Sequence, residues 1–291
     1  MAPTLGPTLT QIRRDLVDGR GFALIRGIPV DSWSREDVAL AFWGIGRYLG
    51  EAIMQNRKGH VLGHVTDIGV DPTNPRFRGY QSAADLMPHT DIASDLVALL
   101  CLRPAKSGGL SMIASASAIF NEILERRPNL AQVLTQPFYI DRREEIPEGK
   151  KPYYQLPVFN PYRGKTTVCY IRRFVESAQR FDDVPALSQA QLEAMDLIDE
   201  LAKSDAIRLN MDFQPGDIQI VNNLTTLHSR TGYEDWPDPE QRRHLLRLWF
   251  AVSDGWPLPS AYFERYDADE HGRPRGVTVP GVRPVASLEP V

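Results

Sequence analysis

The chain has little of several features that mark other classes of protein. It has no excess of basic charge, because Lys and Arg total 33 against 37 Asp and Glu, for a formal net charge of -4. Without a positive field to concentrate a polyanion, we expect no nucleic-acid partner. No apolar run approaches the length that crosses a bilayer, and the amino terminus lacks the basic-then-apolar pattern of a secretory signal. We therefore expect a cytoplasmic protein without a membrane partner.

Cysteine is also scarce, with two residues in 291. Cys101 follows Leu99-Leu100, and Cys169 lies between Val168 and Tyr170, so both are in apolar surroundings. Small thiols in such surroundings are commonly buried and unreacted. We expect two structural thiols and no disulfide.

Internal repeats and low-complexity tracts are absent as well, and the composition, 42% hydrophobic and 24% charged, is that of ordinary globular proteins. A chain of this size can bury a large core as one domain. We predict a single domain over residues 1–291, with its core at about 80–255. Residues 267–291 are rich in Pro, Gly and charge, so we expect a tail that wraps the surface or is poorly ordered.

Hydrophobic periodicity and capping signals predict the secondary structure. The expected helices are Thr8–Val17, one that begins after Ser34 and stops at Gly50, one that begins after Ser115 or Ser117, and one that begins after Ser188 with Gln191 in a capping box. The expected strands are Phe22–Gly27, Leu96–Leu102, Thr166–Ile171, Asp217–Asn222 and His244–Val252.

The separations between these strands are irregular, and insertions lie between them. Such spacing suits an antiparallel double-sheet jelly roll better than an alternating βαβ chain. We predict an α+β protein with a mainly β core and flanking helices.

The candidate chemistry begins at His89-Thr90-Asp91. In an extended backbone, residues two apart point to the same face, so His89 and Asp91 can converge on one ion. An isolated His-x-Asp is more often a pair in a surface loop. This pair, however, precedes an apolar strand, and His228 follows the predicted strand Asp217–Asn222 in a polar stretch. Two imidazoles and one carboxylate form the ligand set of a non-haem Fe(II) centre, with positions left open for further ligands.

Alternation on the strand from Arg243 places Arg243 and Arg247 on one face with Leu245 and Trp249, while His244 faces the other way. Burying an unpaired guanidinium is costly, so these arginines need an anionic partner. The partner is either a bound carboxylate, which matches the planar fork of arginine, or an internal acid such as Asp217.

At this point the chain resembles the TauD/TfdA-type Fe(II)- and 2-oxoglutarate-dependent dioxygenases. The resemblance covers about residues 80–255 and rests on five ordered elements: Pro88-His89-Thr90-Asp91, Ser107-Gly108-Gly109-Leu110-Ser111, Pro215-Gly216-Asp217, Asn222-Asn223 with His228, and Arg242-Arg243-His244-Leu245-Leu246-Arg247. It implies a cupin-like double-stranded β-helix, with iron held by His89, Asp91 and His228. It also implies that Arg243, with help from Ser111, holds the distal carboxylate of 2-oxoglutarate, with Arg242 as the fallback for Arg243.

The resemblance further implies an enzyme that uses Fe(II), 2-oxoglutarate and O2 to oxidise a C–H bond, usually by hydroxylation, with release of succinate and CO2. Arg247 matches a family position that often contacts an anionic substrate group, and Gln81 and Asn223 are weaker candidates for substrate contact. A small carboxylate- or amino-acid-like substrate fits that arginine.

Two other readings stay open at this stage. A zinc hydrolase has the same ligand types, although it gives Arg243 no task. A jelly-roll module that binds a small anion without catalysis has no use for the intact ligand set. The sequence leaves the oligomeric state open, including a homo-oligomer.

Overall fold

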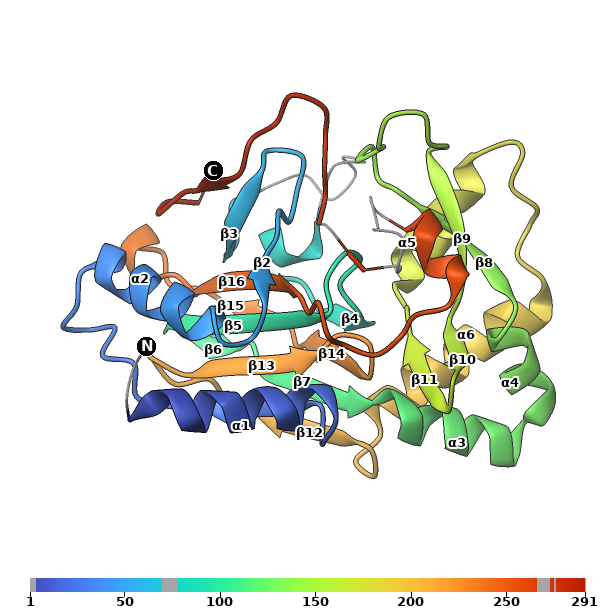
Figure 1. Cartoon of the computed structure of the whole chain (residues 1–291), viewed down its shortest axis with the longest axis horizontal. Helices are drawn as coiled ribbons and strands as arrows, with labels where there is room; N and C mark the ends of the chain where they lie inside the picture. Colours follow the sequence, from blue (N-terminus) through green and yellow to red (C-terminus); the bar gives the residue numbers. More distant parts are fainter. Residues whose placement is uncertain (1–3, 70–77, 266–272, 275, 291) are drawn as a thin grey trace.

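A seven-stranded sheet forms one half of the protein's β core (Figure 1). The computed structural model describes residues 4–69, 78–265, 273–274 and 276–290. In spatial order the strands are β1 (Phe22–Ile25), β13 (Ile218–Asn222), β5 (Leu96–Arg103), β16 (His244–Ala251), β3 (His60–Val65) and β17 (Val285–Ala286), with β2 (Glu51–Ala52) paired to β16. All pairs are antiparallel except β17 with β3.

A second, four-stranded antiparallel sheet forms the other half of the β core. Its order is β12 (Arg208–Met211), β7 (Ser111–Ser115), β14 (Thr226–Arg230) and β4 (Leu86–His89). Three two-stranded pairs complete the β structure: β10 (Phe159–Tyr162) with β11 (Lys165–Val168), β15 (Tyr233–Glu234) with β6 (Ser107–Gly108), and β8 (Pro137–Asp141) with β9 (Tyr153–Pro157). The described residues therefore bear out the prediction of a mainly β, antiparallel core.

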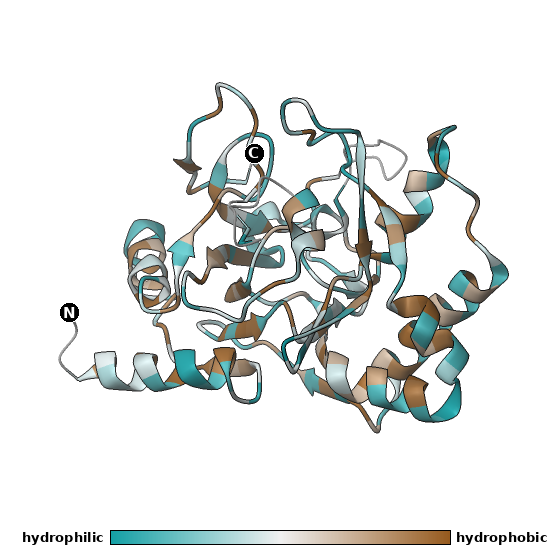
Figure 2. Ribbon diagram, turned by 45° about the vertical axis from the view of Figure 1, so that its right-hand side comes forward, coloured by the Kyte–Doolittle hydropathy of each residue, from teal (hydrophilic) through white to brown (hydrophobic). Residues whose placement is uncertain are grey.

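Six α-helices and four short 3-10 helices flank the sheets in the described residues. The α-helices are α1 (Leu5–Val17), α2 (Arg35–Gly46), α3 (Ala116–Arg126), α4 (Pro128–Leu134), α5 (Arg172–Ser177) and α6 (Gln189–Lys203). The 3-10 helices are η1 (Gly79–Gln81), η2 (Ala178–Arg180), η3 (Pro239–Gln241) and η4 (Ser260–Glu264). In Figure 2 the helical ribbons alternate between hydrophobic and hydrophilic residues, as amphipathic helices do.

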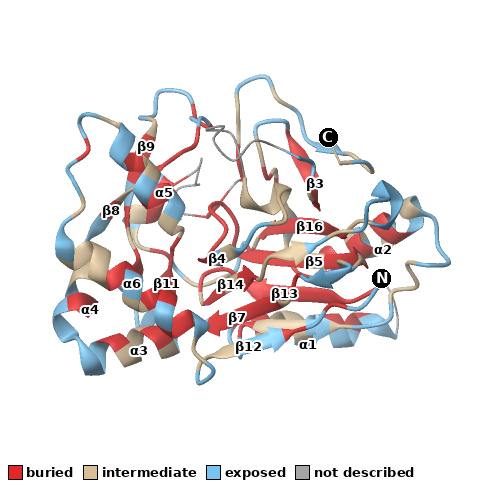
Figure 3. Cartoon of the chain, turned by 180° about the vertical axis from the view of Figure 1, so that it is seen from behind, coloured by how far each residue is buried: buried red, intermediate tan, exposed pale blue. Residues whose placement is uncertain are grey.

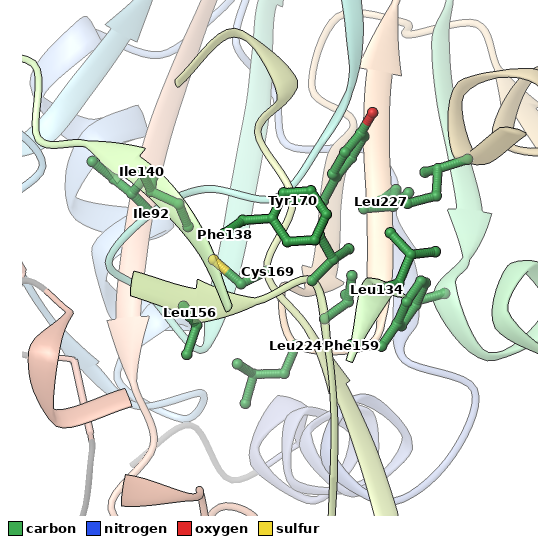
Figure 4. Close-up of a cluster of buried hydrophobic side chains, with 14 of the residues drawn as sticks. Ile92, Leu134, Phe138, Ile140, Leu156, Phe159, Cys169, Tyr170, Leu224 and Leu227 are labelled. Carbon is green, nitrogen blue, oxygen red and sulfur yellow. The ribbon is translucent and has the colours of Figure 1, made fainter. Parts of the chain in front are cut away.

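The described residues form three hydrophobic clusters, of which two are large. In the first, Leu9, Leu16 and Phe42 of α1 and α2 pack on outward residues of the sheet such as Leu246 and Leu248. The second and larger core joins α3, α4 and α6 to the smaller strand pairs, and Figure 4 shows part of it. In Figure 3 the central strands are buried while the outer turns of the helices are exposed. A third, smaller cluster joins Val65, Cys101 and Leu245 of the large sheet to Met211 and Phe213 at the end of β12, so the two sheets also contact each other directly.

Three of the four predicted helix starts are confirmed by their side-chain caps, whereas the first helix begins at Leu5 rather than Thr8 and has no side-chain cap. Ser34 accepts a hydrogen bond from the backbone N–H of Asp37, Ser115 accepts one from Ala118, and Ser188 forms a reciprocal capping box with Gln191. Each cap satisfies donors that a helix amino terminus otherwise leaves unpaired.

The predicted helix stop at Gly50 is wrong. The helix ends at Gly46, and Gly50 does not have a positive φ. The reason for glycine at position 50 is a close approach, because a Cβ there would lie 2.4 Å from the carbonyl oxygen of Ala251 in the large sheet. The predicted strand Thr166–Ile171 is also shorter than expected and ends at Val168, after which Tyr170 donates its N–H to the hydroxyl of Thr90.

Other expectations have mixed outcomes. Cys101 and Cys169 are free and buried, so the prediction of structural thiols is confirmed. Within the predicted tail, Val285 and Ala286 pair with β3, and residues 267–272, 275 and 291 lie outside the described residues. None of the helices in the described ranges has the length and apolar character to traverse a membrane.

Candidate metal centre and arginine-lined cavity

The two histidines of the predicted metal set meet across neighbouring strands. β14 pairs with β4 in the antiparallel sense, and this register places His228 directly opposite His89. Residues in such a pair project from the same face of a sheet. The two imidazole rings lie with their centroids 4.2 Å apart.

Asp91 joins them from the turn after β4, where Asn223 fixes the backbone. The N–H of Asp91 donates to Asn223 Oδ1 at 2.7 Å, and Asn223 Nδ2 donates to the carbonyl oxygens of Asp91 at 2.7 Å and Ser94 at 2.8 Å. As a result the possible ligand atoms of His89, Asp91 and His228 all lie within 4.8 Å of one another. Among the described residues this is the one such group of three or more.

Both imidazoles are held in the neutral form that binds a metal. Burial lowers the pKa of His89, and it lowers the pKa of His228 to about 3. His89 Nδ1 lies 2.8 Å from the carbonyl oxygen of Met87, which can only accept, so Nδ1 carries the proton and the lone pair is on Nε2. The buried Nδ1 of His228 has no hydrogen-bond partner in the described residues.

Asp91 is held as a carboxylate. Burial acts to raise its pKa, but the positive charge of Arg247 and a hydrogen bond from Trp249 help to hold the pKa below its ordinary value. Trp249 Nε1 donates to Asp91 Oδ2 at 2.6 Å, and Arg247 Nη1 lies 3.6 Å from the same oxygen. With Oδ2 already occupied, Oδ1 is the oxygen available to a metal. Two neutral imidazoles and one carboxylate, with an unpaired buried nitrogen among them, fit a ferrous ion.

The metal set opens into a cavity of about 480 Å³ between the two sheets. One wall is formed by Leu245, Arg247 and Trp249 on the inner face of β16 and by Arg243, the residue directly before that strand, as alternation predicts. His244 faces the other way, with its Nε2 2.8 Å from Nδ1 of His64.

Arg247 lies at the metal end of this wall and is held by the protein itself. Its Nε donates to Gln55 Oε1 at 2.7 Å, and its guanidinium carbon lies 4.4 Å from the ring centroid of Tyr80 and 4.8 Å from that of Trp249. Together with the contact to Asp91, these partners stabilise the buried positive charge of Arg247 within the protein.

Arg243 lies farther along the same face and is 3% exposed. No carboxylate is within ion-pair distance of its guanidinium in the described ranges, and its Nη1 has no hydrogen-bond partner there. Burial lowers the pKa of Arg243 to about 10, and the nearby charge of Arg230 adds to the shift. Gly109, with φ of +73°, leaves room for the Arg243 side chain, because a Cβ at that position would lie 3.2 Å from Arg243 Nε.

Ser111 also lines the cavity and is buried. Its hydroxyl donates to Gln219 Oε1 at 2.9 Å, while Gln219 Nε2 has no partner in the described residues. The amide of Gln219 can present either its oxygen or its nitrogen to Ser111. When the nitrogen faces Ser111, the hydroxyl is free to donate to a ligand.

The family model for the taurine catabolism dioxygenase TauD, TfdA family matches residues 2–249. The chain belongs to this family. A curated relative, FR-33289 synthase of Streptomyces rubellomurinus, is 33% identical over 262 residues, which is 88% of this chain and 76% of the relative. The expectations of a dioxygenase and of iron and 2-oxoglutarate as its cofactors are therefore confirmed, and the zinc-hydrolase and non-catalytic readings lose their support.

Solved structures share the fold of this TauD/TfdA-family chain. An asparagine oxygenase in complex with Fe(II), 3-hydroxyasparagine and succinate superposes with a TM-score of 0.62 at 19% identity, covering 85% of this chain and 79% of that one. The non-haem iron oxygenase OrfP in complex with Fe and alpha-ketoglutaric acid superposes with a TM-score of 0.62 at 17% identity, covering 86% and 80%. The likeness confirms the predicted cupin-like fold.

Three predicted residues lie outside the lining of the 480 Å³ cavity. Gln81, at the end of η1, lines a second cavity of about 270 Å³. Asn223 is buried, and its amide is engaged by the backbone around Asp91. Arg242 is half-buried, with Nη2 3.4 Å from the carbonyl oxygen of Pro237. Of the two adjacent arginines, Arg243 is the one that faces the site of this family member.

Sequence reasoning missed several residues that shape the site. Gln55 and Tyr80 hold Arg247 from segments far away in the chain, and no local pattern marks them. Trp249 was placed on the correct face, but its hydrogen bond to Asp91 depends on the turn after β4. Arg230 was visible in the run after His228, and its placement on the same face as His228 follows from a period of two.

Proposed function

We propose that this protein hydroxylates a C–H bond of a small anionic molecule, carboxylate- or amino-acid-like, with consumption of 2-oxoglutarate and O2 and release of succinate and CO2. The observation that carries the proposal is one cavity of about 480 Å³ in which a His-Asp-His set faces an arginine-lined wall. Neither a hydrolase nor a simple anion binder needs both.

In this proposal His89, Asp91 and His228 hold the iron on one side and leave the cavity side open. Bound iron and 2-oxoglutarate supply the oxidising power of dioxygen to a C–H bond held nearby. The chain's own contribution is to orient Asp91 through Asn223 and Trp249, so that little rearrangement is needed when the ion arrives.

Arg243 and Ser111 bind the distal carboxylate of 2-oxoglutarate. The buried Arg243 guanidinium forms no ion pair with a carboxylate of the described residues, so it gains a charge-assisted hydrogen bond from such a ligand. Rotation of the Gln219 amide gives Nε2 a partner in Ser111 Oγ and frees the hydroxyl to donate to the same carboxylate.

Arg247 is the candidate for the substrate's anionic group. It lines the cavity beside the metal set. A ferrous ion bound to Asp91 would neutralise part of the carboxylate's negative charge, which would leave the Arg247 guanidinium available to a second anion. Six arginines and four carboxylates line this cavity, so its walls favour an anion. For Gln81 and Asn223 the position outside the cavity supports no direct contact with a small substrate, and for Asn223 we propose instead the positioning of Asp91.

An anaerobic titration tests the proposal. Protein loaded with Fe(II) and given 2-oxoglutarate should show the weak visible metal-to-ligand charge-transfer band of a chelated keto acid. A zinc hydrolase or a bare anion binder gives no such band. Stimulated succinate release, measured over a panel of small acids and amino acids under air, then identifies the substrate class; a panel in which only neutral molecules stimulate release contradicts the anionic substrate.

A further inference from the structure

Arg230 is a cavity residue that the roles above leave without a task. It is the last residue of β14, two positions after His228, so it projects from the same face of the small sheet. The register with β7 places it directly opposite Ser111, and both residues line the cavity. Arg230 therefore lies at the same end of the cavity as the proposed cosubstrate contacts.

The Arg230 guanidinium is only partly satisfied. Its Nη2 donates to the carbonyl oxygens of Ser82, at 3.1 Å, and Ala84. Its Nε and Nη1 are buried and have no hydrogen-bond partner in the described residues, and the side chain is paired with no carboxylate there. The residue is 5% exposed. Buried cationic donors in this state point to a ligand that is anionic.

Arg243 shares this environment. The guanidinium carbons of Arg230 and Arg243 lie 4.5 Å and 5.1 Å from the ring centroid of the same residue, Tyr233. Two buried cations near one aromatic ring repel each other, and neither forms an ion pair with a carboxylate of the described residues. An anion that both guanidinium groups contact in the cavity relieves the repulsion and gives their open N–H groups an acceptor.

We propose that Arg230 is a second guanidinium of the cosubstrate subsite and binds, together with Arg243 and Ser111, the far carboxylate of 2-oxoglutarate. This inference rests on the proposed function. Such a subsite selects keto acids that carry a second carboxylate, because a methyl group in place of that carboxylate leaves two buried cations without an anionic partner.

The test compares two keto acids of equal chain length. Fe(II)-loaded protein is titrated anaerobically with 2-oxoglutarate and with 2-oxovalerate, which has a methyl group in place of the far carboxylate, and the charge-transfer band gives a Kd for each. We expect the wild-type protein to prefer 2-oxoglutarate by roughly a hundredfold or more, and Arg230→Gln to reduce that preference by roughly tenfold, the usual size of a lost charged hydrogen bond. The Kd for 2-oxovalerate should not weaken.

Arg208→Gln is the matched control, since Arg208 lies in β12 of the same sheet but outside the cavity. This variant should keep the wild-type preference. If Arg230→Gln weakens both keto acids by the same factor, Arg230 acts only by holding the backbone of Ser82 and Ala84, and the inference is overturned.

A second variant, Arg230→Lys, keeps the proposal testable if the Arg230→Gln protein does not fold. Arg230→Lys keeps the charge but offers fewer donors, so it should lower the preference several-fold, and an unchanged preference overturns the inference. The two proposals fail differently. No band in wild-type protein with 2-oxoglutarate refutes the proposed function, whereas a normal wild-type band with an unaltered preference in Arg230→Gln refutes the role of Arg230 alone.

Discussion

The two ends of the cavity differ in whether their buried charged groups have a partner of opposite charge within the described residues. At the metal end, the Asp91 carboxylate accepts a hydrogen bond from Trp249 and pairs with Arg247, and its backbone is fixed by Asn223. At the other end, Arg230 and Arg243 are buried, and no carboxylate of the described residues forms an ion pair with either guanidinium group. The metal ligands are therefore prearranged by the protein, while the arginine end depends on a ligand to balance it.

A single strand displays this difference. Arg247 in β16 and Arg243 just before it lie four residues apart along one wall of the cavity. Arg247 is enclosed by Gln55, Tyr80 and Trp249, whereas Nη1 of Arg243 has no hydrogen-bond partner in the described residues. Equivalent residues in a sequence pattern thus have different surroundings, and substitutions at the two positions should have different consequences.

The largest effect is expected at the metal end. His228→Ala removes one of three ligands and should reduce 2-oxoglutarate turnover by roughly a thousandfold or more, because both metal affinity and activity depend on the complete set. Succinate release and iron content check this. His244→Ala is the matched control, since that imidazole faces away from the cavity and should leave iron binding intact. Normal succinate formation by the His228→Ala protein contradicts the metal assignment.

The next effect is at the arginine end. Arg243→Ala should raise the KM for 2-oxoglutarate by roughly a hundredfold with iron content unchanged, as expected when a buried charged contact is truncated. Initial rates of succinate formation across cosubstrate concentrations measure it. Arg242→Ala, which alters a side chain outside the cavity, should have no such effect, and the reverse result makes Arg242 the cosubstrate ligand.

Arg247→Ala distinguishes substrate binding from support of the metal site. We expect the substrate-stimulated rate to fall by roughly tenfold or more, while slow 2-oxoglutarate decay without substrate persists. The ratio of succinate to hydroxylated product measures this uncoupling. Loss of iron instead shows that the main task of Arg247 is to balance Asp91.

The smallest effect is expected from Trp249→Phe. The ring beside Arg247 remains, but the hydrogen bond to Asp91 Oδ2 is lost. Loss of a contact to a metal-binding carboxylate typically weakens the metal by about tenfold or somewhat more. Competition with an Fe(II) chelator gives the change in Kd, and an unchanged value means that Asn223 alone is enough to orient Asp91.

Local patterns in the sequence predicted the parts of the site that depend on a period of two. His89 and Asp91 converge because of it, and the inner face of β16 was correctly assigned for the same reason. Helix starts were predictable because a serine cap and its partner are three residues apart.

The remainder depends on contacts between distant segments, which a single sequence does not reveal. The local pattern predicts a helix stop at Gly50, but the role of this glycine is set by its close approach to Ala251, far away in the chain. The partners of Arg247 come from Gln55 and Tyr80 for the same reason. The sequence also leaves open whether its inward arginines meet an internal acid or a ligand. In the described residues Arg247 lies 3.6 Å from the carboxylate of Asp91, whereas Arg243 forms no ion pair.

The most direct test of the central claim is a stoichiometric titration of anaerobic protein with Fe(II) in the presence of saturating 2-oxoglutarate, followed by the charge-transfer band. The account predicts a band that rises to one iron per chain in the wild type and is lost in Asp91→Ala. Iron that binds one to one without producing the band, or a band that survives Asp91→Ala at full intensity, contradicts a His-Asp-His centre that chelates a keto acid in this cavity.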